Sequence, residues 1–185
     1  MMKKLSISAM LFAVGLILPF FTGQIQTIGN MLLPMHIPVL LCGLICGWKY
    51  GGAVGFLLPL TRSVLFTMPQ MYPSAVAMAF ELATYGLVVG LVFSKIGWNC
   101  IRALYRALIV AMLAGRAVWG IVMCALLGFR KFTFAVFLAG AFTRAIPGIL
   151  LQLILIPAIM VALGRAKLVP IFGRHHGKDF EKHSR

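Results

Sequence analysis

Residues 74–93 read SAVAMAFELATYGLVVGLVF, a run in which Glu81 is the one charged side chain. About 20 consecutive, mostly apolar residues are enough for an α-helix to cross the hydrocarbon core of a bilayer. Comparable runs fill most of the chain, which is 62% hydrophobic and 11% charged, whereas a typical soluble domain is about 25% charged. The runs are continuous and do not alternate at every second residue, which excludes a transmembrane β-barrel. The sequence therefore predicts an all-α membrane protein.

The length of 185 residues allows about six spans with short loops and leaves no room for a separate soluble domain. We predict a six-transmembrane-helix bundle with helices over residues 5–21, 36–48, 51–66, 74–93, 103–127 and 134–163. The last of these contains Pro147 and Pro157, which predict a kink or a break. Residues 1–164 would form the transmembrane bundle, and residues 165–185 a basic tail.

The basic residues predict the orientation of the bundle. If the N-terminus is cytoplasmic, the cytoplasmic side carries the tail and Lys3, Lys4, Lys49, Lys95, Arg102 and Arg106. The opposite side carries only Arg130 and Lys131. Short cytoplasmic loops are enriched in lysine and arginine, so both termini are expected in the cytoplasm. The net charge of +14 is scattered between apolar runs and forms no basic stripe, so no nucleic-acid partner is predicted.

Four charged residues fall deep inside the predicted spans, away from their ends: Arg62, Glu81, Arg116 and Arg144. Burying such a group unpaired in a membrane costs several kcal/mol, so each should face the bundle interior and have a partner. Their positions along four different helices place all of them between the midplane and the outer half, which suggests one site. We expect Arg62 to pair with Glu81, and the two remaining arginines then favour a carboxylate or phosphate ligand. In the alternative, the arginines only join helices by bonding to Glu81 and to backbone carbonyls.

Four more residues complete the predicted ligand-binding set. Trp119 lies one turn from Arg116 and could stack on a ring of the ligand or simply pack. Asn30 and Tyr72 fall on the predicted outer loops, and His36 opens the second span without an obvious acidic partner.

Catalytic and metal-binding patterns are missing from the sequence. It contains no His-Glu-x-x-His motif and no phosphate-binding glycine loop with lysine, so we predict no catalytic residue, no bound cofactor and no nucleotide hydrolysis by this chain. Cys42 and Cys46 have helical spacing, but no histidine or carboxylate nearby completes a metal site. They are expected to be small buried side chains.

Small residues repeat at intervals of four. Glycines at 43, 47, 51 and 55, and again at 86 and 90, predict close packing between helices. Ala9 and Ala13 form a similar face on the first helix, which could pack inside the bundle or meet a partner subunit.

Residues 36–56 read HIPVLLCGLICGWKYGGAVGF. The His-Ile-Pro-Val start and the glycines that follow resemble the substrate-binding S components of energy-coupling factor (ECF) transporters, in their riboflavin, folate and pantothenate-type branch. The resemblance implies high-affinity capture of a small water-soluble vitamin or precursor at the plasma membrane of a prokaryote. It also implies a transmembrane coupling (T) subunit that docks on Ala9 and Ala13, and two cytoplasmic ATPase subunits that hydrolyse ATP. The loop over residues 22–35 would gate the site.

Two other functions fit the residues. A membrane enzyme could use the arginines to clamp a phosphorylated or lipid-linked substrate, with Glu81 as its base. A structural assembly subunit would use the charges only as internal ion pairs. The sequence does not identify a ligand.

Overall fold

A computed structural model of the chain describes residues 2–22, 34–96, 101–128, 137, 139–140 and 146–166. The described part is helical, with no strand among those residues. Its elements are α1 (Met2–Ile17), η1 (Leu18–Thr22), α3 (His36–Cys46), α4 (Trp48–Phe66), η2 (Met71–Ala75), α5 (Val76–Ile96), α6 (Ile101–Leu127) and α8 (Ile146–Arg165). The predicted all-α fold class is confirmed, and the predicted helix boundaries agree to within a few residues for the first five spans.

The last predicted span, residues 134–163, is described only in part. Its described residues are 137, 139–140 and those of α8, which covers Ile146–Arg165. Pro147 therefore lies in the first turn, where its missing N–H has no helical partner to lose, and Pro157 lies inside the helix. Most of residues 129–145 and all of 167–185 lie outside the described part, so the predicted basic tail stays a prediction.

Four described helical segments are long and apolar enough to cross a membrane. They cover Met2–Phe20, Met71–Ile96, Ile101–Leu127 and Ile146–Arg165. The helix α3 is apolar but has only 11 residues, about 16 Å. The helix α4 has 19 residues and is interrupted by charged side chains at Lys49 and Arg62. The structure thus supports a membrane protein, while the count of six spans stays a prediction.

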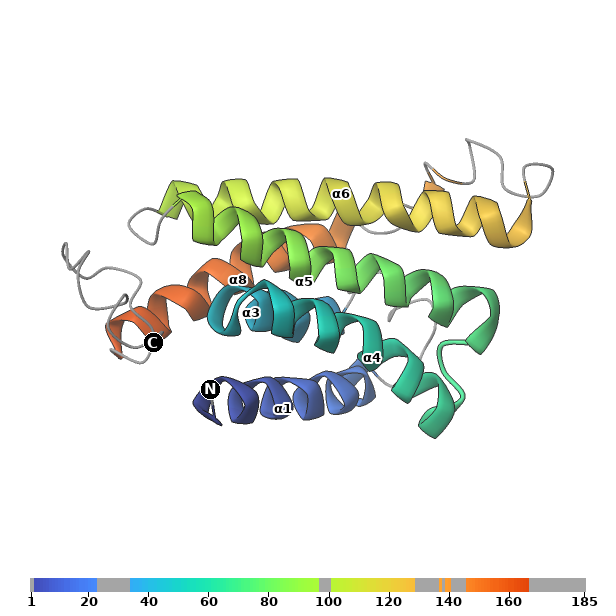
Figure 1. Ribbon diagram of the computed structural model, residues 1–185, viewed down its shortest axis with the longest axis horizontal. Helices are drawn as coiled ribbons and strands as arrows, with labels where there is room; N and C mark the ends of the chain where they lie inside the picture. The colour runs from blue at the N-terminus through green and yellow to red at the C-terminus, as the bar shows by residue number, and fades with distance from the viewer. Residues whose placement is uncertain are drawn as a thin grey trace.

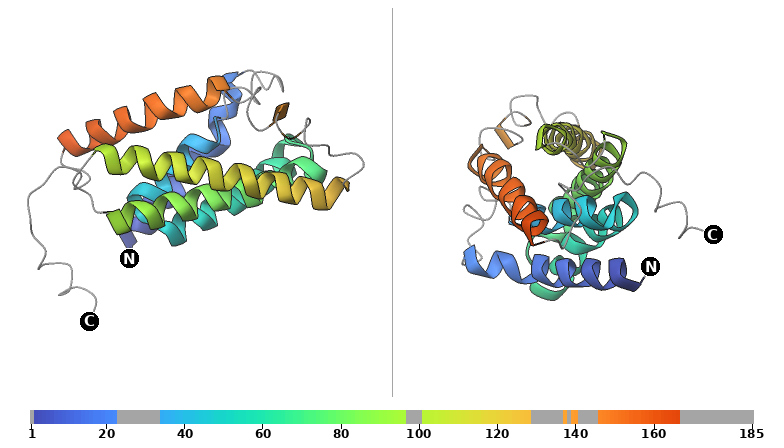
Figure 2. Two further views of the ribbon diagram at one scale, coloured as in Figure 1. Left: turned by 90° about the horizontal axis from the view of Figure 1, so that it is seen from above. Right: turned by 90° about the vertical axis from the view of Figure 1, so that its left-hand side faces the viewer.

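The long helices α4, α5 and α6 run side by side along the long axis of the molecule (Figure 1). The helix α1 crosses α3 and α4 obliquely on one side, and α8 contacts α3 and α6 on another (Figure 2). The start of α1, the turn between α3 and α4, the end of α5, the start of α6 and the end of α8 all lie toward the left-hand end in Figure 1. The basic residues of α1, α4, α5 and α6 outside the bundle core therefore gather at one end, although which side of the membrane that end faces stays a prediction.

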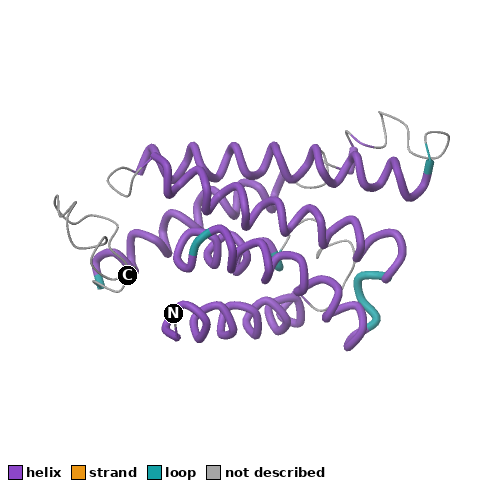
Figure 3. Tube along the Cα trace, in the orientation of Figure 1, coloured by secondary structure: helices purple, strands orange, loops and turns teal. Residues whose placement is uncertain are grey.

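Glycines bring α3, α4 and α5 into backbone contact. Gly47 has a φ of +98° and forms the turn between α3 and α4, seen as a short loop in Figure 3. A Cβ atom added to Gly43 would lie 2.6 Å from the carbonyl oxygen of Gly86, and one added to Gly51 would lie 2.6 Å from the Cα of Gly43. Real Cβ atoms essentially never approach that closely. The predicted close packing is confirmed for Gly43, Gly51, Gly55, Gly86 and Gly90, which set the distance between α3, α4 and α5, whereas Gly47 serves the turn.

The inner face of α1 is formed by Ser8, Leu11 and Gly15, which are buried against the bundle. Ala9 and Ala13 are exposed on the outside of the helix. Their exposure is compatible with docking of a partner subunit, which stays a prediction. The two cysteines of α3 are free thiols buried in the apolar core, as expected.

A buried polar centre between α3, α5 and α6

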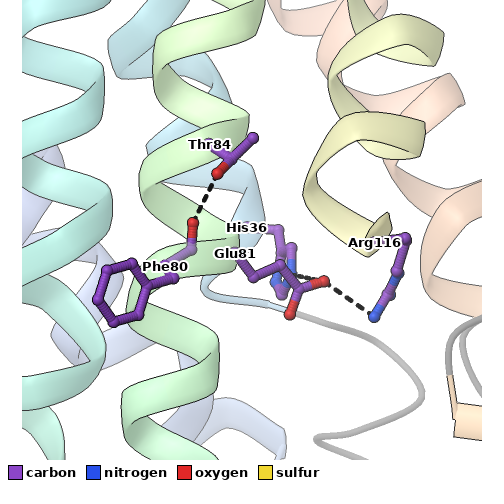
Figure 4. A network of polar contacts seen from close by, with 5 residues as sticks. All are labelled: His36, Phe80, Glu81, Thr84 and Arg116. Carbon is purple, nitrogen blue, oxygen red and sulfur yellow. Dashed lines mark hydrogen bonds and ion pairs between the residues drawn. The ribbon is translucent and has the colours of Figure 1, made fainter. Parts of the chain in front are cut away.

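Glu81 and Arg116 form an ion pair in the middle of the bundle. Glu81 Oε1 lies 2.9 Å from Arg116 Nη1, and both residues are buried (Figure 4). The pairing follows from the antiparallel packing of α5 and α6. Glu81 lies 15 residues before the end of α5 and Arg116 lies 15 residues after the start of α6, so both are about 22 Å from the connection between the helices.

His36 joins this pair from the first residue of α3. Its Nε2 lies 3.7 Å from Glu81 Oε1, and the side chain is 1% exposed. The expectation that His36 lacks an acidic partner is wrong, because α3 is short and its first turn packs against the middle of α5. We call His36, Glu81 and Arg116 the polar centre.

Tyr85 supports the polar centre from one turn further along α5. Its ring lies edge-on to the His36 imidazole, with 5.1 Å between ring centroids. On its other side it packs against α6, where a Cβ atom added to Gly115 would lie 3.1 Å from the ring. Sequence reasoning did not select Tyr85, although its position four residues after Glu81 on an apolar helix was a usable signal.

The remaining donors of Arg116 are the most unusual feature of the centre. Arg116 Nε and Nη2 are buried and have no hydrogen-bond partner among the described residues. The side-chain nitrogen of Gln152, on α8, is likewise buried and unpartnered in the described part. Gln152 was also missed by sequence reasoning, although it is the one amide within the apolar run LLQLIL of residues 150–155. Buried polar groups normally have partners, so these atoms mark where a ligand could bind.

Arg62 does not belong to the polar centre. Its Nη1 donates a hydrogen bond of 2.6 Å to the carbonyl oxygen of Leu16, near the end of α1. Its guanidinium also lies 5.1 Å from the ring centroid of Phe20 and 5.4 Å from that of Phe66. The expected pairing of Arg62 with Glu81 is wrong, because Arg62 points to the carbonyl end of α1, where a cation is favoured.

The other predicted ligand-binding residues lie apart from the polar centre or outside the described part. Trp119 stacks on Phe137, with ring centroids 6.3 Å apart, one turn from Arg116 on α6. Tyr72 donates a hydrogen bond of 2.6 Å to the carbonyl oxygen of Leu126, which lies ten residues beyond Arg116, about 15 Å along the helix. Arg144 and Asn30 fall outside the described residues.

The comparison with protein families assigns the chain. Residues 3–160 match the family model of the substrate-specific component of ECF transporters. The chain belongs to this family. No curated protein and no solved structure matches it. The resemblance of residues 36–56 to the S components of ECF transporters is confirmed, and the chain is a substrate-specific component of a membrane transporter.

For an ECF substrate-specific component, the polar centre is suited to binding. It offers a carboxylate, an imidazole and a guanidinium within one buried cluster, and these groups come from three helices. Glycines bring the backbones of α3 and α5 into contact, and Gly115 of α6 packs against the Tyr85 ring. The groups are therefore positioned on rigid elements before a ligand arrives, which lowers the entropic cost of binding.

Proposed function

We propose that this chain is the S component that binds a small water-soluble vitamin or vitamin precursor at the polar centre and carries it into a prokaryotic cell. The observation that carries the proposal is the buried ion pair of Glu81 and Arg116 with His36 beside it, in a chain of the ECF substrate-specific family. Ionisable groups inside a membrane bundle are costly and commonly mark a transport path.

The partners follow from the family. We propose that a transmembrane coupling subunit and two cytoplasmic ATPase subunits complete the transporter, and that the partners hydrolyse ATP. The exposed Ala9 and Ala13 of α1 support docking of the coupling subunit, since small residues allow two helices to approach closely. The lysines and arginines at one end of the bundle support an orientation with that end in the cytoplasm.

Because Arg62 lies outside the polar centre, the charge expected of the ligand changes. With Arg62 bonded to Leu16, the described part of the centre has one negative and one positive side chain, and the surplus positive charge expected from the sequence is absent from it. We propose a polar ligand that uses hydrogen bonds as well as charge. Arg144, Asn30 and Tyr72 remain proposed ligand contacts.

A ring in the ligand would also be accommodated near the polar centre. Trp119 is one turn from Arg116 and already stacks on another aromatic side chain. Aromatic surfaces bind the flat rings of vitamins by stacking and by burial of apolar area. Trp119 is therefore proposed as the ring contact and Arg116 as the polar contact.

The test is binding of vitamins by the purified protein. We expect small-molecule mass spectrometry of the protein purified in detergent to find one vitamin or precursor bound, and that compound to raise the unfolding temperature of ligand-free protein. Arg106→Lys, an exposed change on the same helix as Arg116, serves as the control and should bind normally. If a panel of water-soluble vitamins and precursors gives no thermal shift and nothing copurifies, the proposed function is wrong.

A further inference from the structure

The guanidinium of Arg116 has two distinct sides. Nη1 faces the Glu81 carboxylate at 2.9 Å, while Nε and Nη2 have no hydrogen-bond partner among the described residues. These two nitrogens lie on the same edge of the planar group and direct parallel N–H bonds outward in a fixed fork. The side chain is 6% exposed, so bulk water does not satisfy that edge.

Leaving these two charged, buried N–H donors without hydrogen-bond partners costs free energy. Hydrogen bonds to charged groups contribute more than those between neutral groups, and an unsatisfied charged donor loses its hydration without compensation. A fork of two parallel N–H groups matches the two oxygens of a carboxylate in one plane. We propose that the Nε–Nη2 edge of Arg116 binds a carboxylate of the transported ligand. This inference rests on the proposed function and specifies the chemical class of the substrate.

Binding a carboxylate also changes the net charge of the polar centre. Glu81 already neutralises Arg116, so a bound carboxylate leaves one excess negative charge in a buried site. His36 Nε2, 3.7 Å from Glu81 Oε1, is the group placed to offset it by taking a proton. Glu81 and Tyr85 on α5 lie beside His36, and Arg116 on α6 pairs with the same Glu81 oxygen. Binding of the carboxylate is therefore accompanied by uptake of about one proton.

The experiment uses pairs of compounds that differ in the carboxylate alone. Suitable probes are nicotinate with nicotinamide, 4-aminobenzoate with 4-aminobenzamide, biotin with biotin amide, and pantothenate with pantothenol. Dissociation constants are measured for the full chain in detergent, for Arg116→Lys and for the control Arg106→Lys. Arg116→Lys keeps the charge that faces Glu81 and removes the fork.

The expected result is an acid that binds at least about tenfold more tightly than its uncharged counterpart. That preference should disappear in Arg116→Lys and persist in Arg106→Lys. Calorimetry of the acid in buffers of different ionisation enthalpy should show uptake of about one proton per ligand.

Other outcomes separate the inference from the proposed function. If a vitamin binds but each acid and its counterpart bind equally, or only uncharged vitamins bind, the carboxylate inference is overturned and the proposed function stands. Failure of every vitamin to bind overturns both.

If the Arg116→Lys protein does not fold, the Glu81→Gln variant tests the carboxylate inference instead. Removing the Glu81 charge leaves the ligand carboxylate as the partner of Arg116, so the acid should still bind and the proton uptake should fall to near zero. Unchanged proton uptake, or loss of the preference for the acid, contradicts the inference.

Discussion

Two buried arginines, Arg62 in the last part of α4 and Arg116 in the middle of α6, have opposite surroundings. Arg62 bonds to the carbonyl oxygen of Leu16 and lies between two phenylalanine rings. Arg116 pairs with a carboxylate through one nitrogen and keeps two donors without a partner among the described residues. Burial and depth are similar for both, so neither identifies a ligand-binding arginine. The hydrogen bonds that Arg116 leaves unmade distinguish the two, and on them rests the proposal that Arg116 binds the ligand.

The contrast has a structural cause. Arg62 lies beside the end of α1, where carbonyl groups lack helical partners and the helix dipole favours a cation. Arg116 lies beside the middle of α5, where backbone groups are already bonded within the helix, so a side chain has to supply its counter-charge. Arg62 therefore holds α1 to α4, and Arg116 is left available for a ligand.

The largest effect is expected from Glu81→Ala. Arg116 would then be a buried charge without a counter-charge, and we expect a loss of about 3–5 kcal/mol of stability, measured by unfolding in detergent. The double change Glu81→Ala with Arg116→Met should recover part of that loss, because no charge is stranded. A double variant as unstable as the single one would show that the ion pair does not set the stability of the centre.

The second-largest effect on stability is expected at Arg62. Arg62→Met removes the hydrogen bond to Leu16 and should cost about 1.5–3 kcal/mol of stability, while the ligand dissociation constant changes by less than about threefold, which is under 1 kcal/mol. Unfolding and ligand titration on the same preparation measure both. A folded Arg62→Met protein with ligand affinity reduced tenfold or more would make Arg62 a ligand residue and remove the contrast.

A smaller effect is expected at Gln152. Gln152→Leu removes an amide nitrogen that has no partner in the described part, so stability should be unchanged or slightly raised. Ligand affinity should fall by roughly three- to tenfold, the worth of one neutral hydrogen bond. Lower stability with unchanged affinity would instead assign Gln152 to packing between α8 and its neighbours.

The smallest effect is expected at Phe20. Phe20→Leu removes one ring from beside Arg62 and should cost about 0.5–1 kcal/mol from the lost cation–π contact, with ligand affinity unchanged. Phe56→Leu is the matched control, since Phe56 is similarly exposed and lies in an edge-to-face pair with Phe80. Equal losses of stability in the two variants would mean that the contact of Phe20 with the Arg62 guanidinium adds no stability beyond ring packing.

Much of the fold could be predicted from the sequence. Continuous apolar runs gave the helices, and glycines at intervals of four gave the closest contacts, because a bilayer forces each segment to satisfy its own backbone. The start of α8 was harder to predict. Pro147 falls in a first turn rather than at a kink, and the hydropathy of the flanking residues does not distinguish the two cases.

The site was predicted only in part. Counting residues along the predicted helices placed all four charges between the midplane and the outer half, with Arg62 and Glu81 at similar depth. Depth does not fix the face of a helix, so Arg62 was assigned to the wrong partner. His36 and Gln152 were difficult for a related reason. Their roles depend on where α3 and α8 lie relative to α5 and α6, and that arrangement is set by packing across the whole bundle.

The most direct test of the central claim compares Arg116→Lys with Arg62→Lys for whichever vitamin copurifies with the wild-type protein. Both changes keep one positive charge and remove a planar fork. We predict that Arg116→Lys raises the dissociation constant at least about tenfold and that Arg62→Lys raises it less than about twofold. Equal losses, or a larger loss in Arg62→Lys with both proteins folded, would contradict a ligand site at the polar centre.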